Sequence, residues 1–286
     1  MKPFLLSMLN GITLAALYFI VASGFTIIFG MMRVVNMAHG SLYLLGAYIG
    51  YSVADVSGSW LLALAGAAAG SAVAGLLMHR IFLDRYQGQE LRQALITIGL
   101  SIVIADLLLA SYGGLTYQVN IPDALFGGVR LPLAGGYPIF RLALIGFAIL
   151  TYVVLWLLIQ RTRFGMIIRA AVDDRQMLAA TGVNVPLVST CVFALAAGLV
   201  GMAGVIGASA LSIAPGDDVH YLLSSLVVVI VGGMGNLKGA AIGALLIGLA
   251  EQLGQAYLPT YSAIISFMIM VAVLAYRPYG LFGRPA

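Results

Sequence analysis

The sequence predicts an all-α fold, a polytopic membrane helical bundle with eight to nine transmembrane stretches. Of its 286 residues, 62% are hydrophobic and only 8% are charged, whereas about 25% of residues are charged in a typical soluble domain. The mean hydropathy is +1.06. The 35 glycines fit helices packed closely in lipid, where small residues let the backbones approach. We expect one transmembrane domain over residues 1–286.

Nine apolar stretches divide the chain, and a helix that spans a membrane needs about 20 residues. They lie near residues 8–30, 41–53, 60–78, 94–112, 142–159, 186–208, 221–235, 238–256 and 261–276. The second stretch is too short to cross alone, so we expect a broken or re-entrant element near residues 31–53. Irregular backbone at that depth must be satisfied by protein or by a water-filled cavity.

The positive charges orient the predicted bundle, because loops on the cytoplasmic side carry an excess of Lys and Arg. Four arginines fall within residues 161–175, which places the loop at residues 161–185 in the cytoplasm. If each stretch crosses once, eleven of the fourteen Lys and Arg lie on that side. This orientation puts the N-terminus outside and the C-terminus inside. The same orientation explains the net positive charge of the chain, so this charge does not indicate a nucleic-acid partner.

Polar residues gather between the first two apolar stretches, at Arg33, Asn36, His39, Gly40 and Ser41. As a catalytic group they are incomplete, because no acid lies close in sequence to orient His39. No second His or Cys supplies metal-ligand spacing. Two interpretations stay open, a pathway or gate element and a histidine satisfied by backbone or by a lipid headgroup.

Two acids lie inside predicted spans, Asp106 in the fourth and Glu251 in the eighth. Each shares a helical face with small or polar residues, which are Gly99, Ala110 and Gly113 for Asp106, and Ala240, Ala244, Gly248 and Gln255 for Glu251. A charge that faces lipid is costly, so we expect both acids to point into the protein. They either line a polar cavity or hydrogen-bond to neighbouring helices.

The loop at residues 161–185 contains a predicted short helix, for which Asp173 and Asp174 are good N-caps and Gly182 is a natural C′ residue. At about 1.5 Å per residue the helix is about 12 Å long, which is too short to be stable alone in water. We therefore expect its flanking spans and a partner to hold it. The candidate docking residues are Asp173, Asp174, Arg175, Met177, Leu178, Ala179, Ala180 and Gly182. The alternative is an ordinary loop with one helical turn.

The glycine-rich segment Gly232–Gly239 does not match a phosphate-binding loop. Such a loop needs Gly-Lys followed by Ser or Thr after a strand, whereas Lys238 precedes Gly239 between two apolar stretches. We therefore expect a tight turn here, and no ATP site or other cofactor in this chain. The single cysteine, Cys191, allows no disulfide within the chain.

Three motifs carry a resemblance to a known family. They are GFTIIFGMMRVVNMAHGSLYLLGAY at Gly24–Tyr48, the segment Arg163–Val185, and VGGMGNLKGAAIG at Val231–Gly243 with the closing RPYGLFG at Arg277–Gly283. The chain resembles the LivH-type permease subunits of bacterial ABC importers for branched-chain amino acids. In such importers the segment similar to Arg163–Val185 provides the coupling helix that sits on the ATPase.

The resemblance implies a multi-pass subunit of the bacterial inner membrane that is not an enzyme, and the charge count then predicts a periplasmic N-terminus and a cytoplasmic C-terminus. Its implied partners are a second, LivM-like permease, two cytoplasmic ATPase subunits that bind ATP, and a periplasmic binding protein that delivers leucine, isoleucine or valine.

Two alternative functions stay open. Importers of urea or amides use similar permeases, but those often carry Gly where this chain has Arg33, and a large extra N-terminal domain, so we expect branched-chain amino acids. An ion-coupled secondary transporter would place an intramembrane acid at its substrate site, a role open to Asp106 or Glu251.

Overall fold

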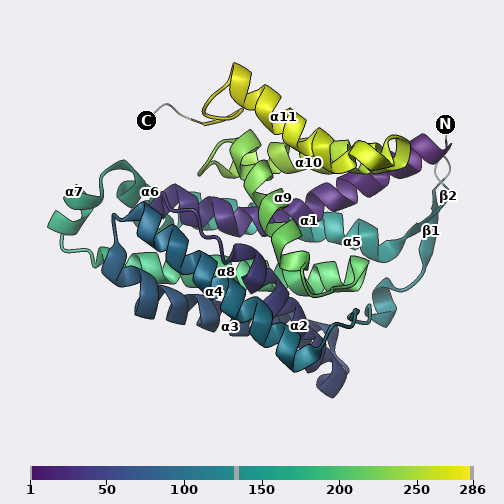
Figure 1. Cartoon of the computed structure of the whole chain (residues 1–286), viewed down its shortest axis with the longest axis horizontal. Coiled ribbons are helices and arrows are strands. Elements are labelled where there is room, and N and C mark those ends of the chain that lie inside the picture. The colour runs from purple at the N-terminus through teal and green to yellow at the C-terminus, as the bar shows by residue number, and fades with distance from the viewer. Residues whose placement is uncertain (1, 132–134, 284–286) are drawn as a thin grey trace.

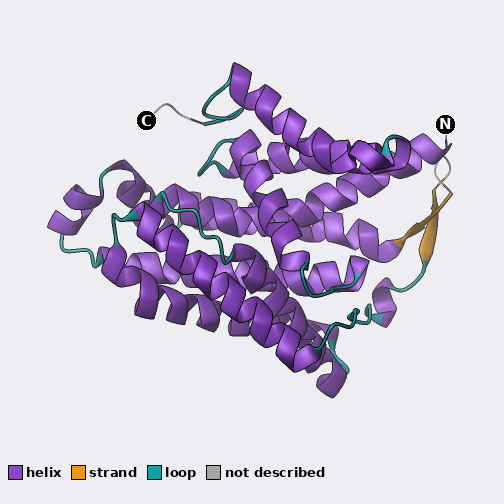
Figure 2. Ribbon diagram, viewed as in Figure 1, coloured by secondary structure: helices purple, strands orange, loops and turns teal. Residues whose placement is uncertain are grey.

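Helices make up most of the computed structural model, which describes residues 2–131 and 135–283 (Figure 1, Figure 2). They are α1 (Lys2–Met32), α2 (His39–Ser57), α3 (Trp60–Met78), α4 (Glu90–Tyr112), α5 (Ile139–Arg161), α6 (Arg163–Asp173), α7 (Arg175–Ala180), α8 (Val185–Leu211), α9 (Asp217–Gly232), α10 (Leu237–Tyr257) and α11 (Ser262–Tyr276). Strands β1 (Gly128–Leu131) and β2 (Gly135–Pro138) form one antiparallel hairpin. Each of the nine predicted apolar stretches corresponds to one helix, and α6 and α7 fall in the predicted loop.

Six helices of the described residues are long and apolar enough to cross a membrane, namely α1, α3, α4, α5, α8 and α10. The helix α2 does not meet the same criteria, and α9 and α11 are shorter, at 16 and 15 residues. The helical bundle of the sequence prediction is therefore present, while a count of eight to nine crossings requires two or all three of these other helices.

The centre of the bundle is formed by α1 and α8. The helix α1 packs against α5, α8, α9 and α10, and α8 packs against α2 and α3 as well. Glycine makes the closest approaches possible, because a Cβ built on Gly46 of α2 would lie 2.2 Å from the Cα of Gly201 on α8. A Cβ on Gly201 would lie 2.2 Å from the Oγ of Ser71 on α3. Small residues therefore set the spacing of these helices, as expected for helices in lipid.

A helix break separates α1 from α2 inside the bundle. The helix α1 ends at Met32, residues 33–38 are not helical, and α2 begins at His39. The Nε2 of His39 lies 2.9 Å from the carbonyl oxygen of Val21, eleven residues or about 16 Å before the end of α1. The predicted broken element near residues 31–53 is thus a break followed by one continuous helix. The apolar run at 41–53 is shorter than this helix, because α2 also includes His39 and Gly40 at its start and residues 54–57, with the charged Asp55, at its end.

The two ends of the bundle differ. Figure 1 shows the N-terminal end of α1 and the β-hairpin at one end, and α6 and α7 at the other. The last described residues lie against the C-terminal end of α9, where the backbone N–H groups of Leu281 and Phe282 donate to the carbonyls of Val231 and Gly232 at 2.9 and 3.0 Å. The segment with four arginines, residues 161–175, therefore lies at the α7 end.

Candidate functional site

The short helix α7 projects from one end of the bundle (Figure 1). Its N-cap is Asp174, whose Oδ1 accepts hydrogen bonds from the backbone N–H groups of Gln176 and Met177, each at 2.9 Å. Gly182 follows the helix with a φ of +85°, a left-handed conformation that favours glycine after a helix end. The predicted capped helix is therefore present. Asp173 is not an N-cap, because α6 continues through it and the extended backbone begins at Asp174.

One side of α7 faces away from the bundle and the other is anchored in it. Met177 is 66% exposed, and Ala179 and Ala180 are exposed too. Leu178 is only 8% exposed, so it holds α7 against this chain and is not available to a partner. The side chain of Arg175 lies outside the part of the chain that the structure describes. The exposed side is therefore apolar at three of the predicted docking positions, Met177, Ala179 and Ala180.

The helix α6, which leads into α7, was not predicted from the sequence. Its buried residues, Gly165, Ile168 and Ala171, recur every three positions, and this spacing is the signal in the sequence that indicates a helix. Gly165 sits so close to the end of α5 that an added Cβ would lie 2.2 Å from the carbonyl oxygen of Ile159. The Arg169 guanidinium donates to the same carbonyl. The pair α6 and α7 is thus fastened to the end of α5.

The polar segment between α1 and α2 is divided between the surface and the core. Arg33 is exposed and has a φ of +53°, a conformation that is uncommon for a residue other than glycine. Asn36 and His39 are buried, and the Nδ2 of Asn36 and the Nδ1 of His39 have no hydrogen-bond partner among the described residues. Buried polar atoms without partners are rare in native proteins. The break therefore holds polar groups that are not satisfied in this conformation.

Gly40 and Ser41 place α2 against α9 and α4. A Cβ built on Gly40 would lie 1.9 Å from the carbonyl oxygen of Asp218 at the start of α9, so only glycine fits. The Oγ of Ser41 lies 2.6 Å from the Oγ of Ser101 on α4 and 3.3 Å from the Oδ2 of Asp218. Three helices are therefore joined by polar contacts at the first turn of α2.

Glu251 points into the protein as predicted, with 8% of its surface exposed. Its Oε2 accepts a hydrogen bond from the hydroxyl of Tyr18 on α1 at 2.8 Å, and the same hydroxyl lies 3.1 Å from the Nε2 of His220 on α9. Among the residues predicted to share its face, Ala240, Ala244 and Gly248 are buried and Gln255 is exposed. Tyr18 and His220 were not predicted as partners of Glu251, although polar residues within apolar stretches were the available signal.

The prediction that Asp106 points into the protein is wrong for this chain. Asp106 is exposed on α4, and so are Gly99, Ala110 and Gly113 of the same face. A Cβ built on Gly99 or Gly113 would meet nothing within 4 Å. The helix packs instead through its opposite side, where Gln93, Thr97 and Leu108 are buried. The small residues around Asp106 therefore form an outer surface of the chain.

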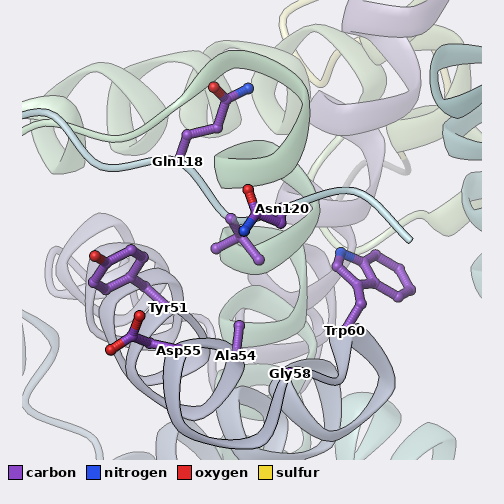
Figure 3. A pocket seen from close by; sticks show the side chains of 8 residues that line it. Tyr51, Ala54, Asp55, Gly58, Trp60, Gln118 and Asn120 are labelled. Atoms are coloured by element: carbon purple, nitrogen blue, oxygen red, sulfur yellow. The ribbon is translucent and has the colours of Figure 1, made fainter. Parts of the chain in front are cut away.

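A small pocket lies where α2 ends and α3 begins (Figure 3). It is lined by Tyr51, Ala54, Asp55, Gly58, Trp60, Gln118, Val119 and Asn120. Its volume is about 90 Å³, whereas pockets that enclose small molecules usually measure about 300–1,000 Å³. The pocket is therefore too small to enclose an amino acid.

Comparisons with known proteins match nearly the whole chain. The family model described as "Branched-chain amino acid transport system / permease component" matches residues 7–274. The high-affinity branched-chain amino acid transport system permease protein LivH of Salmonella typhimurium is 30% identical, over 99% of this chain and 96% of the relative. The corresponding protein BraD of Pseudomonas aeruginosa is 28% identical over the same shares of the two chains.

One solved structure shares the fold. It is described as PsaBC from Streptococcus pneumoniae in complex with Fab, and it aligns with a TM-score of 0.53 over 96% of this chain and 92% of that chain. The sequences are 9% identical, so the likeness concerns the fold alone.

Proposed function

The chain belongs to the family of branched-chain amino acid transport system permease components, and on this premise we propose that it forms half of a membrane pathway for leucine, isoleucine and valine. The second half is a LivM-like permease, and a periplasmic binding protein delivers the substrate. Members of the family are transport subunits and not enzymes, so we place ATP binding and hydrolysis on two separate cytoplasmic ATPase subunits. The match to residues 7–274 is the observation that carries this proposal.

We propose nine crossings, made by the six long helices together with α2, α9 and α11. An odd number puts the two ends of the chain on opposite sides of the bacterial inner membrane. The arginines of residues 161–175 support a cytoplasmic position for α6 and α7, and with nine crossings the N-terminal end of α1 then lies in the periplasm. The separation of these two ends in Figure 1 supports this arrangement.

We propose that α7 couples ATP hydrolysis to the pathway. Its exposed residues Met177, Ala179 and Ala180 are small or flexible enough to enter a groove on an ATPase subunit. Its cap at Asp174 and its buried anchor at Leu178 fix its position on the permease. A movement of the ATPase subunits would then be transmitted through α6 to the end of α5.

We propose that the exposed face of α4 lines the pathway at the contact with the second permease. An ionised Asp106 facing lipid would be costly, and a water-filled pathway or a partner helix removes that cost. We place the gate at the break before α2, where Asn36 and His39 have polar atoms without partners in this conformation. A second conformation that satisfies these atoms would give the segment two stable states.

Reconstitution into proteoliposomes tests the proposal. Labelled leucine should enter only when the second permease, both ATPase subunits, the binding protein and ATP are all present. Uptake by this chain alone, driven by an ion gradient, would instead identify a secondary transporter. Uptake of urea rather than leucine by the complete assembly would support the alternative substrate class.

A further inference from the structure

The helices α1, α9 and α10 bring Tyr18, His220 and Glu251 together, although Tyr18 and Glu251 are 233 positions apart in the sequence. The hydroxyl of Tyr18 lies 2.8 Å from the Oε2 of Glu251 and 3.1 Å from the Nε2 of His220. Tyr18 is 1% exposed and Glu251 8% exposed, whereas His220 is exposed. Two hydrogen bonds in series therefore connect the buried carboxylate of Glu251 to the exposed side chain of His220.

The direction of each hydrogen bond follows from the groups involved. The Tyr18 hydroxyl has one hydrogen, which it donates to the carboxylate of Glu251. Its oxygen then has only lone pairs to offer, so the Nε2 of His220 must carry a hydrogen and donate it. In a neutral ring the other nitrogen, Nδ1, is then an acceptor.

The neighbours of His220 on α9 are neutral or negative. The ring centroid of Tyr221 lies 5.4 Å from that of His220, and Asp217 and Asp218 occupy the first turn of α9. The cations of α1 and α10 are distant, because Lys2 precedes Tyr18 by sixteen residues and Lys238 precedes Glu251 by thirteen, about 20 Å or more along a helix. The exposed acceptor therefore suits a ligand that donates hydrogen bonds and carries positive charge.

We propose that the Nδ1 of His220 receives the ammonium group of the amino acid as it passes, and that Tyr18 and Glu251 hold the ring in the accepting tautomer. This inference rests on the proposed function, which supplies the substrate class. The carboxylate of Glu251 stays hydrogen-bonded to Tyr18 and acts on the cargo through the ring. A single hydrogen bond to the exposed nitrogen lets the cargo leave again. The contact is common to leucine, isoleucine and valine, so it leaves selection among side chains to the binding protein.

The first test compares His220→Lys with Val219→Lys in the complete reconstituted importer. Both positions are exposed on the same turn of α9, but only the first change replaces the acceptor by a fixed cation. His220→Lys should lower leucine uptake per ATP hydrolysed by about tenfold or more. Val219→Lys lies in the first turn of α9, where a long lysine side chain can carry its charge to water, and should lower uptake less than about twofold. Equal losses in the two variants, or full uptake by His220→Lys, would overturn the inference.

Stimulation of ATP hydrolysis by the loaded binding protein separates this inference from the proposed function. If the loaded binding protein does not stimulate ATP hydrolysis in the unmodified importer, the proposed function itself is rejected. If His220→Lys keeps this stimulation but loses uptake, the defect is confined to the contact with the cargo.

A chemical test remains available if His220→Lys does not fold. In the importer with Cys191→Ser, we would place a cysteine by His220→Cys and, as a control, by Val219→Cys. A methanethiosulfonate reagent with an ammonium group should react at position 220 about tenfold faster than one with a sulfonate group, and Glu251→Gln should reduce that preference. The two reagents should react alike at position 219.

A cysteine beside an intact His220 reports on the cargo. In Val219→Cys with Cys191→Ser, L-leucine should slow the reaction, whereas 4-methyl-2-oxopentanoate, which lacks the ammonium group, should not. Equal rates for the two reagents at position 220, or equal protection of position 219 by the two compounds, would reject an ammonium contact.

Discussion

The helices α4 and α8 have the same mean hydropathy but opposite places in the molecule. In the most apolar window of α8, 72% of the residues are buried inside the chain, against 11% in that of α4. The glycines of α8 touch α2 and α3, whereas Gly99 and Gly113 of α4 meet nothing within 4 Å. Apolar character therefore puts both helices in the membrane, and shape decides which one is central. The exposed helices α4 and α7 are then the surfaces on which we place partners.

The largest expected effect separates the glycines of α8 from those of α4. Gly201→Leu should prevent folding of the chain, because a Cβ there would lie 2.2 Å from the Oγ of Ser71 and overpacking costs about 1–3 kcal/mol or more. Gly99→Leu should change the thermal stability of the purified single chain by less than about 0.5 kcal/mol. Yield of folded protein and thermal unfolding in detergent would check both variants, and a stable Gly201→Leu protein would contradict the comparison.

A charge on α7 should abolish coupling without unfolding the chain. Ala179→Arg changes an exposed residue, so the protein should stay in the membrane while ATP-driven leucine uptake falls about tenfold or more. Co-purification of the ATPase subunits and uptake in vesicles are the measurements. Normal results in both would show that α7 does not contact the ATPase.

Leu178→Ala is the matched change on the anchored side of α7. It removes a buried side chain and should destabilise the chain itself by about 2 kcal/mol. Unchanged thermal stability of Leu178→Ala would mean that Leu178 does not anchor α7 to the bundle, and would contradict the difference between the two sides of α7.

Asp106 tests the outer face of α4. Asp106→Leu should leave the single chain as stable as before, because its side chain is exposed there, and should lower uptake severalfold if that face borders the pathway. The conservative change Asp106→Asn, which keeps polar atoms at the same place, should retain more of the uptake. Unchanged uptake with Asp106→Leu would indicate that the face is covered by lipid alone.

The smallest expected effect concerns the cap of α7. Asp174→Ala removes the acceptor of two backbone hydrogen bonds, and loss of an N-cap typically costs about 0.5–2 kcal/mol. Faster amide hydrogen exchange should appear in residues 175–180 only, with little change in α8. Faster exchange throughout the bundle would show that α7 supports the core.

Much of the architecture could be predicted from the sequence. The nine apolar stretches each became a helix, and the residues Asp174 and Gly182 marked the two ends of α7 through local hydrogen bonds and backbone conformation. The helix α6 was not predicted, although it lies next to α7. It has only three buried residues, and the four arginines of residues 161–175 obscure their spacing.

The candidate site could be predicted only in part. Glu251 and Asp106 were both assigned to inward faces from the small residues beside them, and only Glu251 proved to be buried. A small-residue face marks close contact with another helix, but that helix can belong to the same chain or to a partner.

The sequence by itself determined the class of the protein, its family and the order of its helices, because composition and local signals depend on neighbouring residues. Only the tertiary structure decided which faces turn inward and which distant residues meet, as Tyr18, His220 and Glu251 do. The physical reason is that lipid is about as apolar as the protein core. Hydrophobic periodicity, which separates inside from outside in a soluble helix, therefore carries little information here, and steric fit between helices has to settle the arrangement.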